Sequence, residues 1–414
     1  MAEILIVGAG AAGLMAAVFA SRYGAKVTVL EHGEKAGKKI YITGKGRCNV
    51  TNDCTLEEFL REVPRNPRFL YSALSHFSPQ DMIALLEENR CPVEVQRGRR
   101  VYPASMKASD VTRTLLGLCE RQGVRFLYHR EVRSLRTETG EAGQRRASGI
   151  VLADGTELRG DAVILATGGI SYPATGSTGD GYRMAEEAGH TLIPLRPSLI
   201  GLCAAEAWPE ALQGLSLKNV RLTMRCGKKT LYTELGEMLF THFGFSGPLI
   251  LEASCHLPED GKMAELELDL KPGLTPDQLD ARLCRELKNG GRKQARNILQ
   301  TLMPASLAEV FPALCGWPED LLCSQVTGAQ RESLLRSLKH LPLRISGTRP
   351  AEEAVVTRGG VCVKEVDPGT MESRLIRGLY FAGEILDVDA HTGGYNLQIA
   401  FSTGALAGAG AAGN

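Results

Sequence analysis

The sequence has almost no net charge, which argues against one broad class of function. Its 48 lysines and arginines are nearly balanced by 47 aspartates and glutamates, giving a formal net charge of +1 at pH 7. A protein that binds nucleic acid or an anionic membrane through its overall electrostatic field has a clear basic excess. We therefore expect no nucleic-acid partner and no membrane association, although a balanced total does not report on local basic patches.

The sequence also lacks the features of exported and zinc-binding proteins. No basic segment precedes the first apolar run, and glycines interrupt that run, so we expect neither a signal peptide nor a membrane span. The 11 cysteines are scattered, with no C-x-x-C pair and no cysteine–histidine cluster at zinc spacing. These absences favour a cytoplasmic protein with reduced thiols and no metal site.

The six letters GAGAAG are present twice, at 8–13 and at 408–413, and both copies satisfy the dinucleotide-binding pattern G-x-G-x-x-G. The first copy follows the strand-like run EILIV and opens a helical pattern, which is the context that the pattern requires. The second copy follows a run that is itself helical in pattern and has no strand before it. We therefore predict a nucleotide site at the first copy and a frayed tail of small residues at the second.

Each glycine of the first copy has its own predicted role. Gly8 permits a tight turn, Gly10 lets the backbone approach a pyrophosphate, and Gly13 allows the helix to pack closely on the strand. A second strand ends at Glu31, about 20 residues further on, where an acidic side chain can bind a ribose hydroxyl. The predicted phosphate-binding residues, at the turn and the helix N-terminus, are Gly8, Gly10, Ala11, Ala12 and Gly13.

A loop rich in glycine and cations follows, AGKKIYITGKGRCNVTN (36–52). Backbone freedom and positive charge suit such a loop to wrap phosphates and ribitol, so Lys38, Arg47, Cys48 and Asn49 are candidate cofactor contacts. A redox role for Cys48 would need a partner cysteine, and none lies at motif spacing. We therefore interpret Cys48 as a small side chain packed against the cofactor.

Two later strands end in small residues, as a backbone that approaches a cofactor requires. AVILA is followed by Thr167 and Gly168, and LYFA is followed by Gly383 and Glu384. The carboxylate of Glu384 can hold the ribitol or pyrophosphate region of a cofactor. These strand ends extend the predicted site beyond the first glycine turn.

The last helical pattern favours a flavin over a nicotinamide as the bound cofactor. It begins after TGGYN, so that its first backbone N–H groups point at a ligand. Negative charge develops near N1 and O2 of a reduced flavin, and a helix N-terminus stabilises such charge. The candidate residues are Gly394, Asn396, Leu397 and Gln398.

Five stretches together resemble the BaiN/YhiN-type flavoproteins, also called the aminoacetone-oxidase family: GAGAAGL, ITGKGRCNVTN, EMLFTHFGFSGP, VTRGGV and LYFAGEILDVDAHTGGYNLQIAFSTG. The likeness spans the whole chain. It implies FAD as cofactor, with further contacts at Val132 and, in the closing segment, at Asp387. Ala390 stands where the family pattern has glycine, which bears on the conformation of that loop.

The expected fold class is α/β, with a Rossmann-like FAD-binding domain built from both chain ends. The segments are its first part (1–191), an inserted antiparallel β-barrel-like domain (192–274), a small helical subdomain (275–341) and the closing part (342–414). Period-two alternation indicates strands in the insert, and helical patterns broken by prolines indicate the subdomain. A meander of strands is expected between the first βαβ unit and AVILA.

The chemistry is expected to be redox on a small-molecule substrate. His242, in the loop THFGFSGP, and Tyr395 are the candidate proton donors or acceptors. No second strand, glycine turn and helix unit appears between Gly169 and Gly360, so NAD(P)H would have to enter the flavin cleft transiently.

The main functional hypothesis is an FAD-dependent reductase that uses NAD(P)H to reduce an activated C=C bond in a hydrophobic carbonyl compound such as a steroid or bile acid. The alternatives are an oxidase of small amines such as aminoacetone, a flavoprotein acting on RNA, and a flavin-binding protein without catalysis. No feature of the sequence indicates an oligomeric state.

Overall fold

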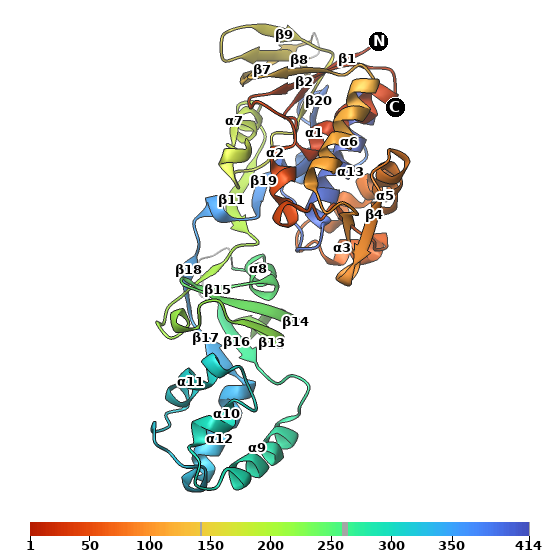
Figure 1. Cartoon of the computed structure of the whole chain (residues 1–414). Coiled ribbons are helices and arrows are strands. Elements are labelled where there is room, and N and C mark those ends of the chain that lie inside the picture. The colour runs from red at the N-terminus through yellow and green to blue at the C-terminus, as the bar shows by residue number, and fades with distance from the viewer. Residues whose placement is uncertain (141–142, 259–263, 414) are drawn as a thin grey trace. The chain divides into compact units, whose positions relative to one another are not determined.

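The computed structural model describes residues 1–140, 143–258 and 264–413 and divides into two compact units. The first unit combines Met1–Ser198 with the chain from Pro350 onward, and the second is Leu199–Arg349. Red and blue segments, from opposite chain ends, therefore share the first unit (Figure 1). The second unit begins seven residues after the expected boundary at 192, because strand β11 (Leu192–Ser198) pairs with β19 (Val356–Val361) of the first unit, and it ends eight residues after the expected limit at 341.

A parallel sheet with strand order β20-β10-β1-β2-β6 forms the centre of the first unit. Strands β1 and β10 consist almost entirely of apolar residues, as expected for strands that are covered on both faces of the sheet. β20 comes from the C-terminal part of the chain and pairs with β10, which completes the sheet. The strands are β1 (Glu3–Val7), β2 (Lys26–Glu31), β6 (Arg125–Tyr128), β10 (Ala162–Leu165) and β20 (Leu379–Phe381).

Three small antiparallel groups of strands flank this sheet. The expected meander is confirmed only for β7, β8 and β9; the first segment assigned to it, 125–128, is instead β6 of the parallel sheet. Its half-buried residues align with β2 rather than with β7, which sequence alternation could not distinguish. The remaining strands are β3 (Thr51–Asn52), β4 (Val93–Gln96), β5 (Arg100–Pro103), β7 (Val132–Thr139), β8 (Arg145–Leu152) and β9 (Glu157–Arg159).

Two helices rich in small residues, α1 (Ala11–Arg22) and α13 (Tyr395–Ala411), pack against each other in the first unit. A Cβ on Gly404 would overlap the carbonyl oxygen of Ala12, and one on Gly408 would overlap that of Ala16. The glycines therefore allow the two backbones to approach closely.

This packing corrects the prediction for the second GAGAAG copy. Residues 408–411 belong to the 17-residue helix α13, and Gly408 and Ala409 are buried. The prediction of a frayed tail was wrong because it treated small side chains as a lack of packing, whereas here they are what makes close packing on α1 possible.

The other helices of the first unit surround the sheet and the small strands. Helix α6 begins at Ala108 after Lys107, with no side-chain cap, although Ser109 and Asp110 are residue types that often cap helices. The helices are α2 (Lys38–Ile42), α3 (Leu56–Arg61), α4 (Tyr71–His76), α5 (Pro79–Glu88), α6 (Ala108–Arg121) and α7 (Asp180–Glu187).

A seven-stranded antiparallel sheet, of order β17-β16-β13-β14-β15-β12-β18, forms the core of the second unit. Its two edge strands, β17 and β18, are separated in the chain by Arg344 alone, so the sheet must curl to bring its edges together. The strands are β12 (Leu202–Ala204), β13 (Ser216–Cys226), β14 (Lys229–Thr241), β15 (Gly244–Ser246), β16 (Glu265–Asp269), β17 (Leu341–Leu343) and β18 (Ile345–Thr348).

A helical subdomain lies between β16 and β17 and shares the second unit's own apolar core, which is separate from the core of the first unit. Two of its N-terminal caps are explained by the sequence, since Thr275 of α9 and Thr327 of α12 form capping boxes with Gln278 and Gln330. Pro276 follows the first cap at the position where proline suits a helix start. The helices of this unit are α8 (Pro248–Ser254), α9 (Pro276–Gly290), α10 (Ala295–Leu299), α11 (Ala305–Leu314) and α12 (Gly328–Lys339). No helix among the described residues is long and apolar enough to cross a membrane.

Candidate functional site

The predicted cofactor residues of the strands gather at one edge of the parallel sheet. Gly8 follows β1, Glu31 ends β2, Thr167 follows β10, and Gly383 follows β20. Because these strands are parallel and in register, their carboxyl ends meet at the same edge. This is the edge at which doubly wound folds bind nucleotides.

The glycine turn has the geometry expected of a phosphate-binding turn. Gly8 has φ +101°, and a Cβ there would lie 2.5 Å from the carbonyl oxygen of Ala166. A Cβ on Gly13 would overlap the carbonyl oxygen of Gly8. Gly10, the cap of α1, has no atom within 4 Å of its Cβ position. Two glycines therefore close the turn, while the third leaves open space before the helix N-terminus.

Glu31 is held against this turn by backbone hydrogen bonds. Its Oε2 accepts from the Ala9 N–H at 3.0 Å, and its Oε1 accepts from the Gly33 N–H at 2.8 Å. The carboxylate is thus fixed beside the open space at Gly10, with lone pairs left for a hydroxyl. Lys38, predicted as a phosphate contact, ion-pairs with Glu34 at 3.4 Å.

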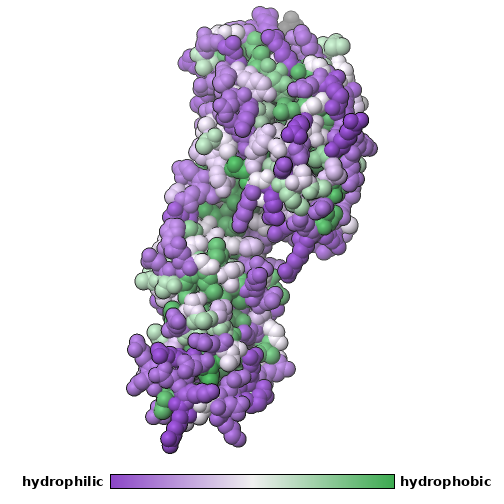
Figure 2. Space-filling view, in the orientation of Figure 1, coloured by the Kyte–Doolittle hydropathy of each residue, from purple (hydrophilic) through white to green (hydrophobic). Residues whose placement is uncertain are grey.

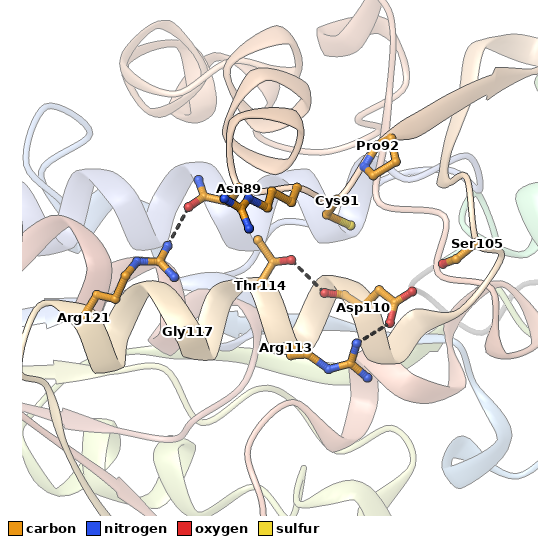
Figure 3. A pocket seen from close by; sticks show the side chains of 10 residues that line it. Asn89, Cys91, Pro92, Ser105, Asp110, Arg113, Thr114, Gly117 and Arg121 are labelled. Carbon is orange, nitrogen blue, oxygen red and sulfur yellow. Dashed lines mark hydrogen bonds and ion pairs between the residues drawn. The ribbon is translucent and has the colours of Figure 1, made fainter.

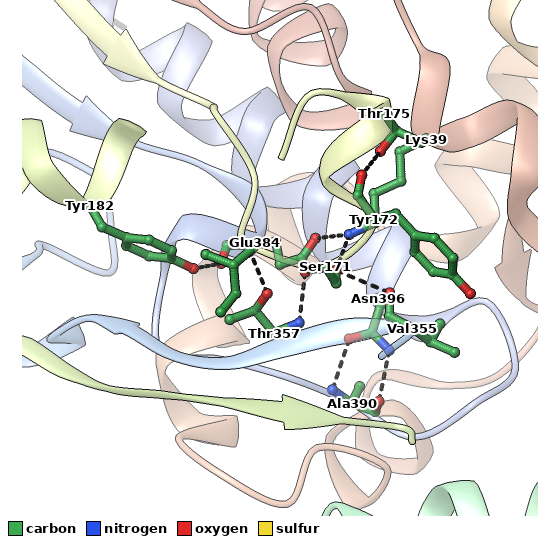
Figure 4. A network of polar contacts seen from close by, with 11 residues as sticks. Lys39, Ser171, Tyr172, Thr175, Tyr182, Val355, Thr357, Glu384, Ala390 and Asn396 are labelled. Carbon is green, nitrogen blue, oxygen red and sulfur yellow. Dashed lines mark hydrogen bonds and ion pairs between the residues drawn. The ribbon is translucent and has the colours of Figure 1, made fainter. Parts of the chain in front are cut away.

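Glu384 lies at the centre of a polar network (Figure 4). Its carboxylate accepts from Lys39 Nζ at 2.7 Å, from Ser171 Oγ at 2.9 Å and from the Thr357 N–H at 2.7 Å. Charge-assisted bonds of this kind fix geometry firmly. The network joins the end of β20 to α2 and β19, and it shows that the cation paired with Glu384 is Lys39, next to the predicted Lys38.

The residues after β10 are packed tightly around the same network. Gly168 has φ +76°, and a Cβ there would lie 2.9 Å from Ser177 Oγ. The hydroxyl of Thr167 is buried and makes no hydrogen bond among the described residues. The Tyr182 hydroxyl donates to the Glu384 carbonyl at 3.2 Å, and burial raises the pKa of Tyr182 well above its usual value, so this hydroxyl stays neutral.

The loop after α2 folds back on itself through a run of left-handed residues. Gly44, Lys45 and Cys48 have φ values of 57°, 59° and 60°. The Arg47 guanidinium lies 4.9 Å from the centre of the Tyr102 ring. Asn49 carries a buried Oδ1 that has no hydrogen-bond partner among the described residues, which leaves an acceptor for a ligand.

The environment of Cys48 favours a packing role over a role as nucleophile. Its side chain is fully buried, and burial raises the pKa of the thiol to about 12. The thiolate required for redox or nucleophilic chemistry is therefore absent at neutral pH. The interpretation as a small packed side chain agrees with this burial.

The residue before α13, Gly394, occupies a position that only glycine can take. Gly394 has φ +99°, and a Cβ there would overlap the carbonyl oxygen of Thr51. Helix geometry leaves the N–H groups of Asn396 and Leu397 without intrahelical partners. The Gln398 N–H, predicted to be free, donates to the Gly394 carbonyl at 3.1 Å, because the first intrahelical bond closes there.

The side chains of Gln398 and Asn396 make hydrogen bonds to backbone groups of the protein. Gln398 is buried and donates to the Phe77 carbonyl at 3.2 Å. Asn396 accepts from the Ala390 N–H at 2.9 Å and donates to the Ala390 carbonyl at 2.7 Å. Ala390 does not adopt a positive φ, so alanine fits where glycine was expected. Any ligand contact from Asn396 would therefore come from its backbone.

Asp387 contacts the segment before α4. Its Oδ2 accepts from Asn66 Nδ2 at 3.0 Å, while its Oδ1 is buried without a hydrogen-bond partner among the described residues. Burial raises the pKa of the Asp387 carboxyl, and the Arg65 guanidinium and the Asn66 amide oppose this rise. Val132, the contact implied by the family resemblance, is the buried first residue of β7.

The two candidate proton donors have different environments. Tyr395 is buried at the start of α13, and its ring packs edge-on against Phe59 with centroids 5.1 Å apart. His242 is exposed in the turn between β14 and β15 of the second unit, with its ring against Phe243. Tyr395 therefore belongs to the unit that carries the glycine turn, and His242 does not.

A pocket of about 380 Å³ lies elsewhere in the first unit, between the end of α5 and α6 (Figure 3). Arg121 donates to Asn89 Oδ1 at 2.6 Å, and Arg113 ion-pairs with Asp110 at 3.0 Å. None of the predicted cofactor residues lines it, so it is separate from the sheet edge.

The residues at the sheet edge fit FAD in two respects. The open space at Gly10 lies before a helix N-terminus, as a pyrophosphate requires, and the buried acceptor atoms of Asn49 and Thr167 have no hydrogen-bond partner in the described parts of the chain. No group of three or more potential metal ligands occurs in the described parts of the chain.

Sequence reasoning missed three residues of the Glu384 network. Lys39, Ser171 and Thr357 come from α2, the loop after β10 and β19, and two of them lie in stretches that the sequence had singled out, Lys39 in 36–52 and Thr357 in VTRGGV. Ser171, four residues after Thr167, lay outside those stretches but carried its own signal: a small polar residue just beyond a strand end at the nucleotide edge.

Comparison with known proteins agrees with this geometry. Residues 2–410 match the family described as HI0933-like protein Rossmann domain. The chain is 33% identical to a ribosomal RNA dihydrouridine synthase of Haemophilus influenzae over 97% of this chain and 96% of that protein. It is also 33% identical to a 3-dehydro-bile acid delta(4,6)-reductase of Clostridium scindens over 100% of this chain and 99% of that protein.

Among solved structures, a 3-ketosteroid-delta4-(5alpha)-dehydrogenase of Rhodococcus jostii covers 100% of this chain and 97% of its own, with a TM-score of 0.54 at 17% identity. This likeness shows a shared fold. The family match, the whole-length relatives and the nucleotide edge agree, and the chain belongs to the HI0933-like Rossmann-domain family of FAD-dependent oxidoreductases.

Proposed function

We propose that this protein is an FAD-dependent reductase that adds hydrogen across a C=C bond conjugated to a carbonyl. The observation that carries the proposal is that two whole-length relatives, each 33% identical to the chain, are named for different substrates but for the same bond change. The proposed reaction is the chemistry that the two names share.

The shared chemistry follows from the two names. A delta(4)-reductase of a 3-dehydro bile acid saturates a bond next to a ketone. A dihydrouridine synthase saturates the C5=C6 bond of uracil, which is conjugated to the C4 carbonyl. In both substrates the carbonyl withdraws electrons, so a hydride adds at the far carbon of the double bond and a proton then adds at the near one.

FAD, when bound and reduced, would supply the hydride. The open turn at Gly10 would admit its pyrophosphate, Glu31 would accept a ribose hydroxyl, and the Asn49 and Thr167 acceptors would bind polar groups of the cofactor. The N-terminus of α13 would favour negative charge on the reduced ring through the N–H groups of Asn396 and Leu397.

Tyr395 is the better placed of the two predicted proton donors. It is the first residue of α13 and lies in the unit that carries the glycine turn. A neutral tyrosine hydroxyl can deliver a proton to carbon once the hydride has been added. His242 is proposed only as the alternative, because it lies in an exposed turn of the other unit.

NADH or NADPH is the proposed source of electrons. The described structure contains one parallel nucleotide sheet, in the first unit, and the second unit is built on an antiparallel sheet. NAD(P)H would therefore bind transiently near the flavin. This agrees with the expectation from the sequence, in which only the G-x-G-x-x-G copy at 8–13 has the strand and helix that a nucleotide site needs.

The test is an anaerobic titration of the FAD-loaded protein with NADH and NADPH, followed by addition of a 3-keto-4,6-diene bile acid or a uridine-containing RNA. The proposal predicts that the flavin absorption is bleached by a nucleotide and restored by one of the substrates, whose mass rises by two hydrogens for each saturated bond. Reoxidation by neither compound would overturn it. Bleaching by aminoacetone, with oxygen consumption on admission of air, would favour the amine oxidase.

The distribution of charge on the protein bears on the choice between a bile acid and an RNA as the substrate. The balanced net charge predicted no nucleic-acid partner, but relatives named as ribosomal RNA dihydrouridine synthases, at 33% and 31% identity, remove the support for that expectation. The distribution of charge on the second unit is therefore more informative than the total.

A further inference from the structure

The helical subdomain carries a local excess of positive charge that the total conceals. We call the five cations Arg285, Lys288, Arg292, Lys293 and Arg296 the α9–α10 basic surface. All five are exposed. The sequence has no acidic residue from 287 to 308. In the space-filling view, the end of the second unit that carries α9, α10 and α12 is largely hydrophilic (Figure 2).

The charges of this surface are not neutralised by ion pairs within the described part of the chain. No carboxylate among the described residues lies within ion-pair distance of any of the five, whereas their neighbours Arg282 and Arg331 pair with Glu286 and Asp280. Lys288, in the last turn of α9, stabilises the negative end of the helix. Arg296 lies in the last turn of the short helix α10 in the same way, and Arg285, Arg292 and Lys293 have no such role.

The backbone that carries two of these cations is fixed in place. The Cys323 N–H donates to the Lys293 carbonyl at 2.9 Å, and the Ser324 N–H donates to the Gly291 carbonyl at 2.9 Å. The Ala295 N–H donates to the Leu321 carbonyl at 2.7 Å. The loop between α9 and α10 is therefore tied to the chain at 321–324 on both sides of Lys293, and its cations are presented from a defined backbone.

We propose that the α9–α10 basic surface binds the phosphate backbone of RNA, and that a uracil ring of this RNA is the substrate of the reductase. The inference rests on the proposed function, since it selects one of the two substrate classes that share the reaction. Several unpaired, exposed cations on one surface suit a polyanion, for which each phosphate contact releases a counterion. A bile acid carries too little charge to need them.

An anionic membrane is the less suitable partner. Helices that lie on membranes insert large apolar side chains next to their cations. The exposed large apolar residues of the described chain include none between 276 and 339, the range of α9 to α12. The surface thus offers charge without an apolar anchor.

The experiment compares two variants that remove the same two charges. Lys288→Ala/Lys293→Ala changes the basic surface, and Lys228→Ala/Lys229→Ala changes exposed lysines at the hairpin between β13 and β14 of the same unit. The full-length, FAD-loaded proteins are titrated into a fluorescein-labelled, uridine-containing RNA stem–loop, and anisotropy is followed over a series of salt concentrations.

Removal of two phosphate contacts should weaken RNA binding by about ten-fold at 0.1 M salt and reduce the slope of log K against log salt by about 1.5. The hairpin variant should bind like the wild type. Lys288→Arg/Lys293→Arg should retain the affinity, since it keeps both charges. Equal affinities for the two alanine variants, or no salt-dependent binding by the wild type, would overturn the proposal.

Two further measurements separate this proposal from the proposed function. Reduction of the bile-acid dienone by all variants at the wild-type rate, with no RNA binding, would leave the reductase standing and remove the RNA surface. Binding to RNA through this surface, without reduction of either substrate, would do the reverse. Loss of binding to phosphatidylserine vesicles with unchanged RNA binding would assign the surface to membranes and overturn the proposal.

Discussion

The two GAGAAG copies have the same letters and different structures. In the first copy the glycines close a turn between β1 and α1 and leave open space at Gly10. In the second copy Gly408 lies in the last turn of the packed helix α13, against the Ala16 carbonyl. A glycine-rich pattern therefore indicates that backbone comes close to something, and the flanking elements decide whether that is a phosphate or another helix.

The helices that contain the two copies, α1 and α13, also pack against each other. Ala12 belongs to the first copy, and its carbonyl oxygen is where a Cβ on Gly404, just before the second copy, would overlap. The helix that presents the nucleotide turn is thus positioned by the helix that ends in the repeated letters. The two copies contribute to one site by different means.

The largest effect is expected from Gly13→Val. A Cβ on Gly13 overlaps the Gly8 carbonyl oxygen, and neither backbone can move without breaking the turn, so we expect a loss of about 3 kcal/mol or more in the free energy of unfolding. Urea denaturation of the FAD-free protein measures it. Wild-type stability would contradict the turn geometry.

A smaller but clear loss is expected from Gly408→Ala in the second copy. The new methyl group would push α13 away from α1, at a cost of about 2 kcal/mol in the free energy of unfolding. Gly10→Ala is the matched control, since it makes the same change where no atom lies within 4 Å, and its effect should stay within about 0.5 kcal/mol. Equal losses in the two variants would mean that α13 does not pack as described.

Gly10→Val separates binding from stability in the first copy. Its side chain would fill the open space before the α1 N-terminus, so we expect a folded protein whose FAD affinity falls by more than about ten-fold. Flavin content after reconstitution and isothermal titration with FAD measure this, with Gly408→Ala as the comparison. Full occupancy in Gly10→Val would remove the pyrophosphate from this turn.

Neither copy contains a titratable side chain, so both classes of glycine variant should keep the wild-type dependence of stability on pH. His190 should set part of that dependence. It is buried, its Nε2 lies 2.8 Å from Ser373 Oγ, and burial lowers its pKa below 6.5. Ser373 Oγ already accepts two backbone N–H bonds, so its own proton points to a neutral ring.

A depressed histidine pKa means that the unfolded chain binds the proton more readily. Stability should therefore be complete above pH 6.5 and fall as the pH drops below it, by at most about 1.4 kcal/mol per pH unit. His190→Phe should flatten this part of the profile measured by urea denaturation at several pH values. An unchanged slope would show that His190 is not the responsible group.

The sequence was sufficient for the sheet edge and insufficient for its surroundings. The strand ends at Gly8, Glu31, Thr167 and Glu384 could be predicted because apolar runs that stop at small or acidic residues have one physical explanation in a parallel sheet. The partners of Glu384 could not, because a bond between residues 39 and 384 depends on how distant loops pack.

Small residues and short strands account for the errors. Helix α13, which includes residues 408–411, has almost no contrast between apolar and polar faces. Its sequence pattern therefore gives no sign of the contact with α1 that buries it. The strand 125–128 is too short to reveal by alternation which neighbour it pairs with. Both were settled by tertiary contacts that local sequence does not encode.

The C-terminal origin of β20 and α13 has a consequence for synthesis. The ribosome completes the strands β1, β2, β6 and β10 and then the whole second unit before the chain can supply the last strand and the helix that covers α1. Until then the apolar face of α1 stays without its partner, and such exposed surfaces invite aggregation. Synthesis of α13, rather than emergence of the glycine turn, is thus the event that makes the nucleotide domain whole, and chains cut short near residue 394 should depend on chaperones.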